Sequence, residues 1–409
     1  MKQLVGVETL SPKSTAALAI AGTLAWLPMN LLPYEITTLA DDFKLGMRGA
    51  SLAATVQLLV LASTATWLGR TIDRRDKRRL TILGILIGIA ASVISMLVHN
   101  VESVIVCCAV VGVGCGMIAA ATCALPTLHE NPERVFAYMQ VTLGVLFGLG
   151  NWAIGVAAPL GKERVTFVQL AFLVILGGSA LLLPRGVMNT GVGAAAGAAA
   201  VRNQSISKEV LAGIVAVTLF WASIEGIWAF AERAGIGRGL SEQSLVLWLT
   251  ISGFTASAGG LVAAALGKRY GYVAPLTAGF ICHIFSAMTM YCLGGHDAYI
   301  VGIMVFNAPV TLTAAYLMGL LAELDRTGRG AAIGGAATNF GAAVGPVLGL
   351  FVTRVENLAP VGISTISLLC TACGLSVWAA KRKLSISAAH RLAEHGGVER
   401  AGATPTGLF

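Results

Sequence analysis

The chain has 409 residues, of which 56% are hydrophobic and only 12% are charged, and its formal net charge is +8. Soluble domains carry about 25% charged residues, so this composition, with a mean hydropathy of +0.79, excludes a soluble globular protein. Because lipid offers no hydrogen bonds to the backbone, membrane segments are helices or closed barrels. The apolar runs are long and continuous rather than alternating, which indicates helices.

Twelve runs are apolar over roughly 20 residues, the length that a helix needs to cross the bilayer. The first six are predicted at residues 15–40, 48–69, 80–98, 101–127, 134–160 and 164–184, and the second six at 209–233, 241–266, 273–293, 297–322, 331–353 and 359–380. The stretch between them is small and polar, which is typical of a flexible linker. We therefore expect an N-terminal six-helix bundle at 1–184, a cytoplasmic linker at 185–208, a C-terminal six-helix bundle at 209–380 and a cytoplasmic tail at 381–409.

The distribution of basic residues predicts the orientation. With the N-terminus in the cytoplasm, 21 of the 28 Lys and Arg residues fall in cytoplasmic segments, and short cytoplasmic loops carry such an excess. The densest cluster is GRTIDRRDKRRL at Gly69–Leu80, the short loop between the second and third spans. We therefore expect a multi-pass protein of the cell inner (cytoplasmic) membrane with both termini in the cytoplasm. Because topology explains the basic charge, nucleic acid is not expected as a partner.

The two halves of the chain share features at matching places. The segment Lys268–Gly271 after the eighth span aligns with Asp73–Asp76 after the second, and Arg134 and Arg329 occupy matching helix starts. Internal duplication in a polytopic membrane protein is typical of transporters built from repeats.

On these features the chain resembles the major facilitator superfamily of secondary transporters, over its whole length in span number, central linker and topology. That family's loop signature has a Gly, then Asp-Arg four residues on, then a Gly and two basic residues. The residues that match it are Gly69, Asp73, Arg74, Lys77 and Arg78. Asp76 stands where the family has Gly, and Thr71 where it favours Leu. The resemblance implies an all-α integral membrane protein with twelve transmembrane helices in two pseudo-symmetric six-helix bundles.

The resemblance also implies that this loop locks the cytoplasmic side in one conformation and releases it in another. Gly69 would let two helix ends approach closely, and Asp73 could accept hydrogen bonds from a neighbouring helix start and pair with arginine. The alternative is that these charges only enforce the topology. The candidate latch residues are Gly69, Asp73, Arg74, Lys77, Arg78, Arg134 and Arg329.

Glycines recur at helical spacing in span eleven, at Gly341, Gly345 and Gly349, and Pro346 follows the second of them to make a Gly-Pro pair. Small residues at every fourth position let helices pack closely in lipid. The family's antiporter signature is a similar Gly-Pro pattern on span five, where this chain has glycines but no Gly-Pro pair. This difference argues against an antiporter without excluding one.

Charged side chains within the hydrocarbon are costly, so each is a candidate functional residue. In span seven, Trp221, Glu225, Trp228 and Glu232 recur at helical spacing and share one face. This aromatic and acidic stripe is predicted to line a central cavity, with Glu225 in proton coupling or substrate contact. For Glu232 we expect instead a position among the lipid headgroups.

In span one, Pro28 and Pro33 predict a kinked helix whose freed carbonyl groups can bind polar groups. Glu35 in this span is a candidate for the same cavity, or alternatively a carboxylate near the outer surface paired with Arg48 or Arg238. The complete candidate substrate or proton site is Glu225, Glu35, Asn30, Tyr34, Trp221, Trp228, Asn151, Asn307 and Asn339.

The sequence therefore predicts a secondary active transporter that moves a small organic solute by alternating access, coupled to protons. It shows no catalytic constellation, metal-ligand cluster or nucleotide-binding loop, so we expect no enzyme activity, no cofactor and no metal. A proton-driven multidrug efflux antiporter is the first alternative, because buried acids and aromatic rings suit neutral or cationic amphiphiles. A membrane receptor that binds a solute without moving it is the second. The expected partners are a small-molecule substrate, protons and the lipid bilayer, and the expected state is a monomer.

Overall fold

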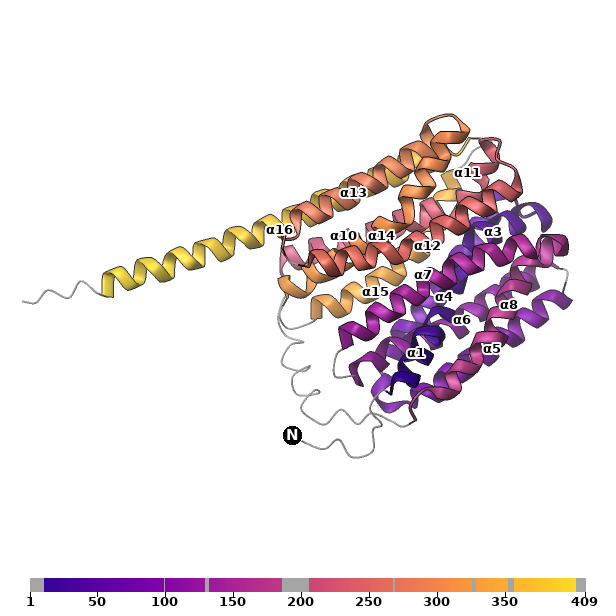
Figure 1. Ribbon diagram of the computed structural model, residues 1–409, viewed down its shortest axis with the longest axis horizontal. Coiled ribbons are helices and arrows are strands. Elements are labelled where there is room, and N and C mark those ends of the chain that lie inside the picture. The colour runs from indigo at the N-terminus through magenta and orange to yellow at the C-terminus, as the bar shows by residue number, and fades with distance from the viewer. Residues whose placement is uncertain are drawn as a thin grey trace, which may run out of the picture.

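The computed structural model describes residues 11–98, 100–128, 132–185, 206–267, 269–325, 329–351 and 357–401. Within these ranges the chain is helical and has no strand, which confirms the predicted all-α class. Figure 1 shows long helices packed side by side, with those of the first half (indigo to magenta) next to those of the second (orange). The linker predicted at 185–208 lies largely outside the described residues, so its boundaries stay a prediction.

The first half contains, in chain order, α1 (Pro12–Leu24), α2 (Leu27–Asn30), α3 (Leu32–Thr37), η1 (Thr38–Asp42), α4 (Gly46–Gly69), η2 (Ile72–Arg74), α5 (Lys77–Leu97), α6 (Val101–Ala124), η3 (Leu125–Leu128), α7 (Pro132–Val156), η4 (Ala158–Glu163), α8 (Arg164–Gly177) and η5 (Gly178–Leu182). The second half contains α10 (Lys208–Ala229), α11 (Ala231–Gly237), α12 (Glu242–Leu266), α13 (Val273–Ala287), η6 (Met288–Cys292), α14 (His296–Leu324), α15 (Arg329–Val344), η7 (Gly345–Phe351) and α16 (Ala359–Ala401). The η elements are short 3-10 or π-helical turns.

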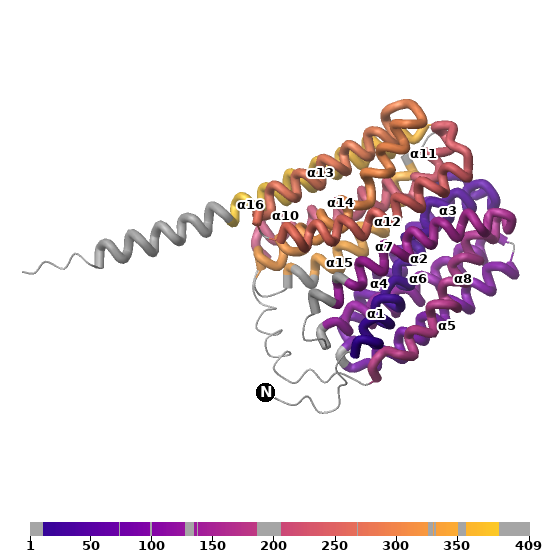
Figure 2. The backbone as a smooth tube through the Cα atoms, viewed as in Figure 1, coloured from indigo at the N-terminus to yellow at the C-terminus, as the bar shows by residue number. Residues whose placement is uncertain are grey.

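Eleven segments of the described chain are long and apolar enough to cross a membrane. The predicted first span is not among them, because it is divided into α1, α2 and α3. Pro28 and Pro33 explain the division, since proline lacks the N–H for a helical hydrogen bond and its ring clashes with the preceding turn. The twelve predicted spans therefore correspond to eleven continuous segments and one kinked one. Figure 2 traces this path along the backbone.

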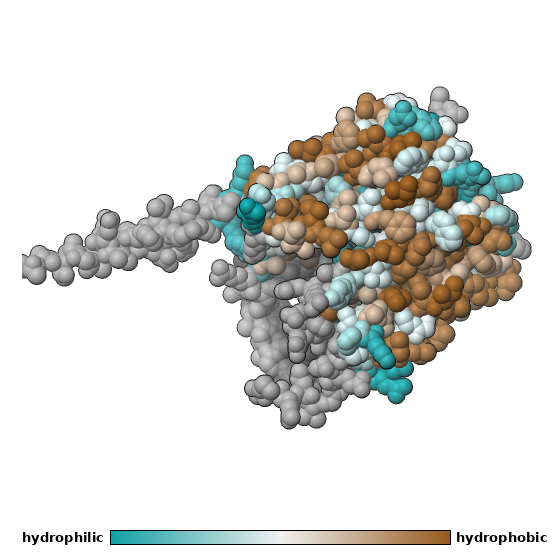
Figure 3. Space-filling model, viewed as in Figure 1, coloured by the Kyte–Doolittle hydropathy of each residue, from teal (hydrophilic) through white to brown (hydrophobic). Residues whose placement is uncertain are grey.

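The outside of the bundle is apolar. Trp67, Leu97 and Ile175 are 61%, 73% and 75% exposed, and Figure 3 shows hydrophobic residues (brown) covering the sides of the bundle. Exposed apolar surface of this extent marks an interaction with another apolar phase. Together with the span lengths, it places these helices in a bilayer.

Glycines bring helices into close contact, both between the two halves and within the second half. A Cβ atom added at Gly253 of α12 would lie 2.9 Å from the backbone of Gly148 in α7. A Cβ atom added at Gly345 would lie 2.6 Å from Cβ of Glu225 on α10. Gly349 approaches the side chain of Ser51 on α4 in the same way. The small residues predicted to pack span eleven do lie at such approaches.

The basic loop at residues 69–80 joins α4 to α5. Asp76, which departs from the family signature, is the N-cap of α5 and accepts a hydrogen bond from the backbone N–H of Arg79 at 3.0 Å. Lys77 is only 2% exposed, and its Nζ donates to the carbonyl of Ile72 at 3.3 Å. The side chains of three predicted latch residues, Asp73, Arg134 and Arg329, lie outside the described part of the structure. The latch therefore stays a prediction.

Candidate functional site

A cavity of about 420 Å³ lies between the two halves of the chain. In the first half its lining comes from α6, α7 and the α1–α2 region, and in the second half from α10, α12, α14 and α15. Most of this lining is apolar. The aromatic side chains in it are Trp26, Phe136, Phe147, Trp221, Trp228 and Phe306.

The cavity reaches toward one end of the bundle. We call this the linker end, because α8 with η5 finishes there and α10 begins there, and we call the opposite end the far end. From Trp228 near the end of α10 and Phe306 in α14, the lining continues to Phe136 near the start of α7 and Met318 near the end of α14. Phe136 is 43% exposed. The cavity lining therefore reaches the exposed surface at the linker end.

Glu225 is the acidic residue of this cavity lining. Its side chain is 6% exposed, and its Oε2 atom has no hydrogen-bond partner in the described part of the chain. A buried carboxyl without partners is costly as an isolated charge. This position is therefore suited to an exchangeable partner, either a proton or a cationic group on a solute.

A polar residue of α14 lies in the same lining. The Nδ2 atom of Asn307 donates to the hydroxyl of Ser252 at 2.7 Å, and this hydroxyl donates to the carbonyl of Ile303 at 2.6 Å. The two bonds fix the orientation of the amide, whose oxygen is left as an acceptor for a solute.

Aromatic rings close the cavity on its far side. The ring of Trp228 stacks parallel on Phe306 with centroids 6.1 Å apart, and Phe147 of α7 lies 4.9 Å from Trp228 on another side. The indole Nε1 of Trp228 donates to the backbone carbonyl of Asn30 at 3.2 Å. This hydrogen bond connects α10 to the kinked first span. Asn30 thus contacts Trp228 through its backbone carbonyl and not through its side-chain amide.

Ion pairs join the two halves beyond this aromatic layer, at the far end. Arg164, at the start of α8, contacts Glu232 of α11 at 3.1 Å and also pairs with Glu242 of α12. Asp41 of η1 pairs with Arg233. Glu232 is 2% exposed, so the expectation that it lies among lipid headgroups is wrong: Arg164 offsets the cost of burying its charge.

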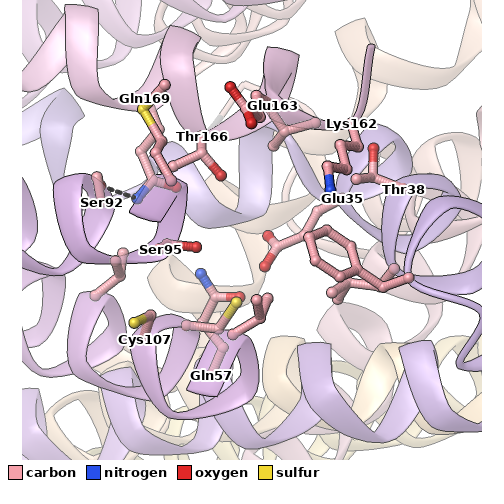
Figure 4. Close-up of a pocket in the computed structure, with 17 residues that line it drawn as sticks. Glu35, Thr38, Gln57, Ser92, Ser95, Cys107, Lys162, Glu163, Thr166 and Gln169 are labelled. Atoms are coloured by element: carbon pink, nitrogen blue, oxygen red, sulfur yellow. Dashed lines mark hydrogen bonds between the residues drawn. The ribbon is translucent and has the colours of Figure 1, made fainter. Parts of the chain in front are cut away.

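The remaining candidates lie outside the cavity lining. Tyr34 is fully buried with Arg164 over its ring at 6.0 Å, so it belongs to the far-end cluster. The amide of Asn151 is bonded within its own helix, donating to the carbonyl of Phe147 at 2.9 Å. Asn339 is not part of the lining. Glu35 faces a separate chamber within the first half (Figure 4).

The structure thus brings together Glu225, Trp221, Trp228 and Asn307 in one lining, and Glu35, Tyr34, Asn151 and Asn339 lie outside it. Asn30 is also outside the lining and contacts Trp228 through its backbone carbonyl. Sequence reasoning missed the face of α7 that lines the cavity. This face consists of Phe136, Met139, Gln140, Leu143, Gly144 and Phe147. These residues recur at helical spacing, so the pattern could have been found in the sequence.

The family described as the Major Facilitator Superfamily matches residues 18–346. No curated protein matches the sequence. Among solved structures, an inward open conformation of the xylose transporter XylE from E. coli has a TM-score of 0.68 and 12% identity, over 89% of this chain and 94% of that one. A variant of the nucleoside transporter NupG has a TM-score of 0.67 and 13% identity, over 91% and 98%. A D-xylose-proton symporter has a TM-score of 0.69 and 12% identity, over 88% and 96%.

Proposed function

Since this chain belongs to the major facilitator superfamily, we propose that it is a secondary active transporter that moves a small organic solute by alternating access, coupled to protons. The observation that carries this proposal is the cavity at the interface of the halves, whose lining reaches the linker end, while aromatic contacts and ion pairs lie beyond it at the far end. A solute bound there can leave toward the linker end. It reaches the far end only after the ion pairs and the aromatic layer separate.

The charge distribution supports assigning the linker end to the cytoplasm. The dense basic loop between α4 and α5 lies at this end, and positive charge favours the cytoplasmic side. On this assignment the protein is in an inward-facing conformation, with both termini in the cytoplasm of a cell whose inner membrane it spans. We propose a monomer, because one chain supplies the whole cavity lining.

The cavity lining indicates the kind of solute. Each hydroxyl of a sugar that enters a closed site needs a hydrogen-bond partner, whereas this lining is dominated by six aromatic side chains and other apolar groups. Aromatic rings contribute through stacking and burial of apolar area. We therefore favour a solute with an aromatic or aliphatic body and few polar groups over a polyol such as the xylose of two structural relatives.

The second candidate function is efflux of amphipathic cations in exchange for protons. Glu225 among aromatic rings favours it, because a cation can pair with the carboxylate and also contact ring faces. Competition between proton and solute for one carboxyl would make the exchange obligatory. Span five has no Gly-Pro pair, which argues against an antiporter. Its Gly148 instead packs against Gly253 of α12.

A two-stage experiment tests the proposal. A thermal-shift screen on the purified full-length protein identifies ligands, and each labelled ligand is then offered to proteoliposomes with the lumen either acidic or alkaline. A transporter accumulates the ligand under one gradient, and the sign of that gradient separates symport from exchange. A receptor would bind saturably, yet neither gradient would move the ligand, and this result would overturn the proposal.

A further inference from the structure

A second and smaller chamber lies within the first half of the chain. It has a volume of about 50 Å³, and none of its lining residues is shared with the central cavity. A water needs about 10–15 Å³ of such volume together with polar partners, so the chamber has room for a few. Its polar lining residues are Glu35, Thr38, Gln57, Ser92, Ser95, Lys162, Glu163, Thr166 and Gln169.

Glu35 projects into this chamber, with Gln57 of α4 beneath it (Figure 4). Glu35 is 7% exposed and Gln57 is 2% exposed. The amide of Gln57 contacts both carboxyl oxygens of Glu35. An amide can donate to an ionised carboxylate through its nitrogen or, turned over, accept from a protonated carboxyl through its oxygen. Gln57 is therefore a suitable partner for both protonation states of Glu35.

The groups that face Glu35 are otherwise neutral in the interior of the chamber. They are Cys107 and Cys108 from α6, Ser92 and Ser95 from α5, Thr38 from η1, and Thr166 and Gln169 from α8. Besides Glu35, the lining has two charged residues. These are Lys162 and Glu163, and both come from η4. Neither Arg48 nor Arg238 belongs to the lining. The chamber therefore does not place Glu35 beside either arginine that the sequence suggested as its partner.

The lining leads from Glu35 to the surface at the far end. Gln169 and Ser92 are buried and hydrogen-bonded to each other at 3.2 Å, Thr166 is half-buried one turn away, and Lys162 is exposed. Figure 4 shows Lys162 and Glu163 on the opposite side of the chamber from Gln57. Polar groups in a membrane protein are costly unless they bind or conduct something. These polar side chains, set among apolar lining residues, offer water and protons a route between Glu35 and the far end.

We propose that Glu35 is a second proton-binding site, which exchanges protons with the far-end solution through this chamber while the central cavity is accessible from the linker end. A hydronium ion at the far end delivers one proton to the Glu35 carboxylate, and the Gln57 amide changes from donor to acceptor. This inference goes beyond the proposed function, because it does not depend on any solute. In one conformation, Glu35 and Glu225 then communicate with opposite sides of the membrane.

Charge displacement after a pH jump tests this site. Right-side-out vesicles from cells that overproduce the chain are adsorbed on a capacitive electrode, and the outer solution is stepped from alkaline to acidic. Vesicles from cells with the empty vector provide the background. We expect a transient current that persists in Glu225→Gln and disappears when Glu35→Gln is added. In everted vesicles the step should instead give a current that Glu225→Gln removes and Glu35→Gln retains.

Two further variants keep the test decisive if Glu35→Gln folds poorly. Ser95→Leu fills the chamber without touching the carboxyl and should also abolish the outer transient. Glu163→Gln removes the carboxyl at the rim and should retain it. An outer transient that survives both Glu35→Gln and Ser95→Leu would overturn the proposal. Absence of the Glu225-dependent current in everted vesicles would count against the proposed function alone.

Discussion

The guanidinium of Arg164 lies 3.1 Å from the carboxylate of Glu232, and this contact joins the first half of the chain to the second at the far end. The two residues are 14% and 2% exposed. In alternating access, contacts at one end must break when that end opens. Because this pair is buried, breaking it contributes a large cost to the free-energy difference between the two conformations.

Arg164→Gln should shift the protein away from the conformation that is closed at the far end. Removing one partner of a buried ion pair costs about 3–5 kcal/mol, because the other charge stays buried. Even half of that cost would change the population ratio by about tenfold. Spin labels on Arg48→Cys and Gln243→Cys, one in each half, should report longer distances in the variant.

Arg238→Gln is the matched control for this measurement. Arg238 is also at the far end, but it donates to the carbonyl of Tyr291 within its own half, at 2.9 Å. We expect its distance distribution to resemble that of the parent protein. Equal distributions for the Arg164 and Arg238 variants would mean that the ion pair does not hold the halves together.

Gly253→Ala should destabilise the protein, whereas Gly260→Ala in the same helix should not. The added methyl group at Gly253 would meet the backbone of Gly148, which cannot move aside like a side chain, while nothing lies within 4 Å of a Cβ at Gly260. Overpacking typically costs about 1–3 kcal/mol. Thermal unfolding in detergent gives the comparison, and equal midpoints would contradict close packing of α7 on α12.

Sequence patterns predict the features that belong to a single helix. The spans, the kink at Pro28 and Pro33, and the shared face of Trp221, Glu225 and Trp228 follow from local hydropathy and periodicity. They do not predict where a side chain lies when its place depends on contacts between distant parts of the sequence. Glu232 was expected in headgroups because its partner, Arg164, is distant in the sequence. Glu35 was grouped with the cavity because a broken helix does not preserve the angles of a straight one.

The predicted orientation can be measured by labelling cysteines from each side. In a background without the eight native cysteines, Asp76→Cys should react only with reagent supplied to the cytoplasmic side, and Asp297→Cys only with reagent outside. Asp76 caps α5 in the basic loop, and Asp297 lies in the first turn of α14. Reaction of both positions from the same side would refute the twelve-span topology.

Asp73→Asn should leave folding intact and slow transport, if the basic loop is a latch. Charge-assisted hydrogen bonds contribute about 1.5–3 kcal/mol, which is enough to change a two-state ratio by about tenfold. Asp76→Asn is the control in the same loop, because asparagine also serves as an N-cap. The readout is initial transport rate at matched protein content. Equal transport rates in the two variants would mean that the charges of the loop only enforce the topology.

Glu225→Gln should abolish accumulation driven by a pH gradient while exchange of solute across the membrane partly survives. The substitution keeps the shape of the side chain and much of its hydrogen bonding but removes its ability to take up and release a proton. Exchange needs no net proton movement, so it separates coupling from binding. Glu209→Gln on the same helix is the control, since Glu209 lies outside the cavity and pairs loosely with Arg382 at 3.8 Å.

If Glu225 instead pairs with a cationic solute, binding itself should be lost and exchange should fail as well. Normal gradient-driven accumulation by a well-folded Glu225→Gln protein would exclude both roles, because no other acidic residue lines the described cavity.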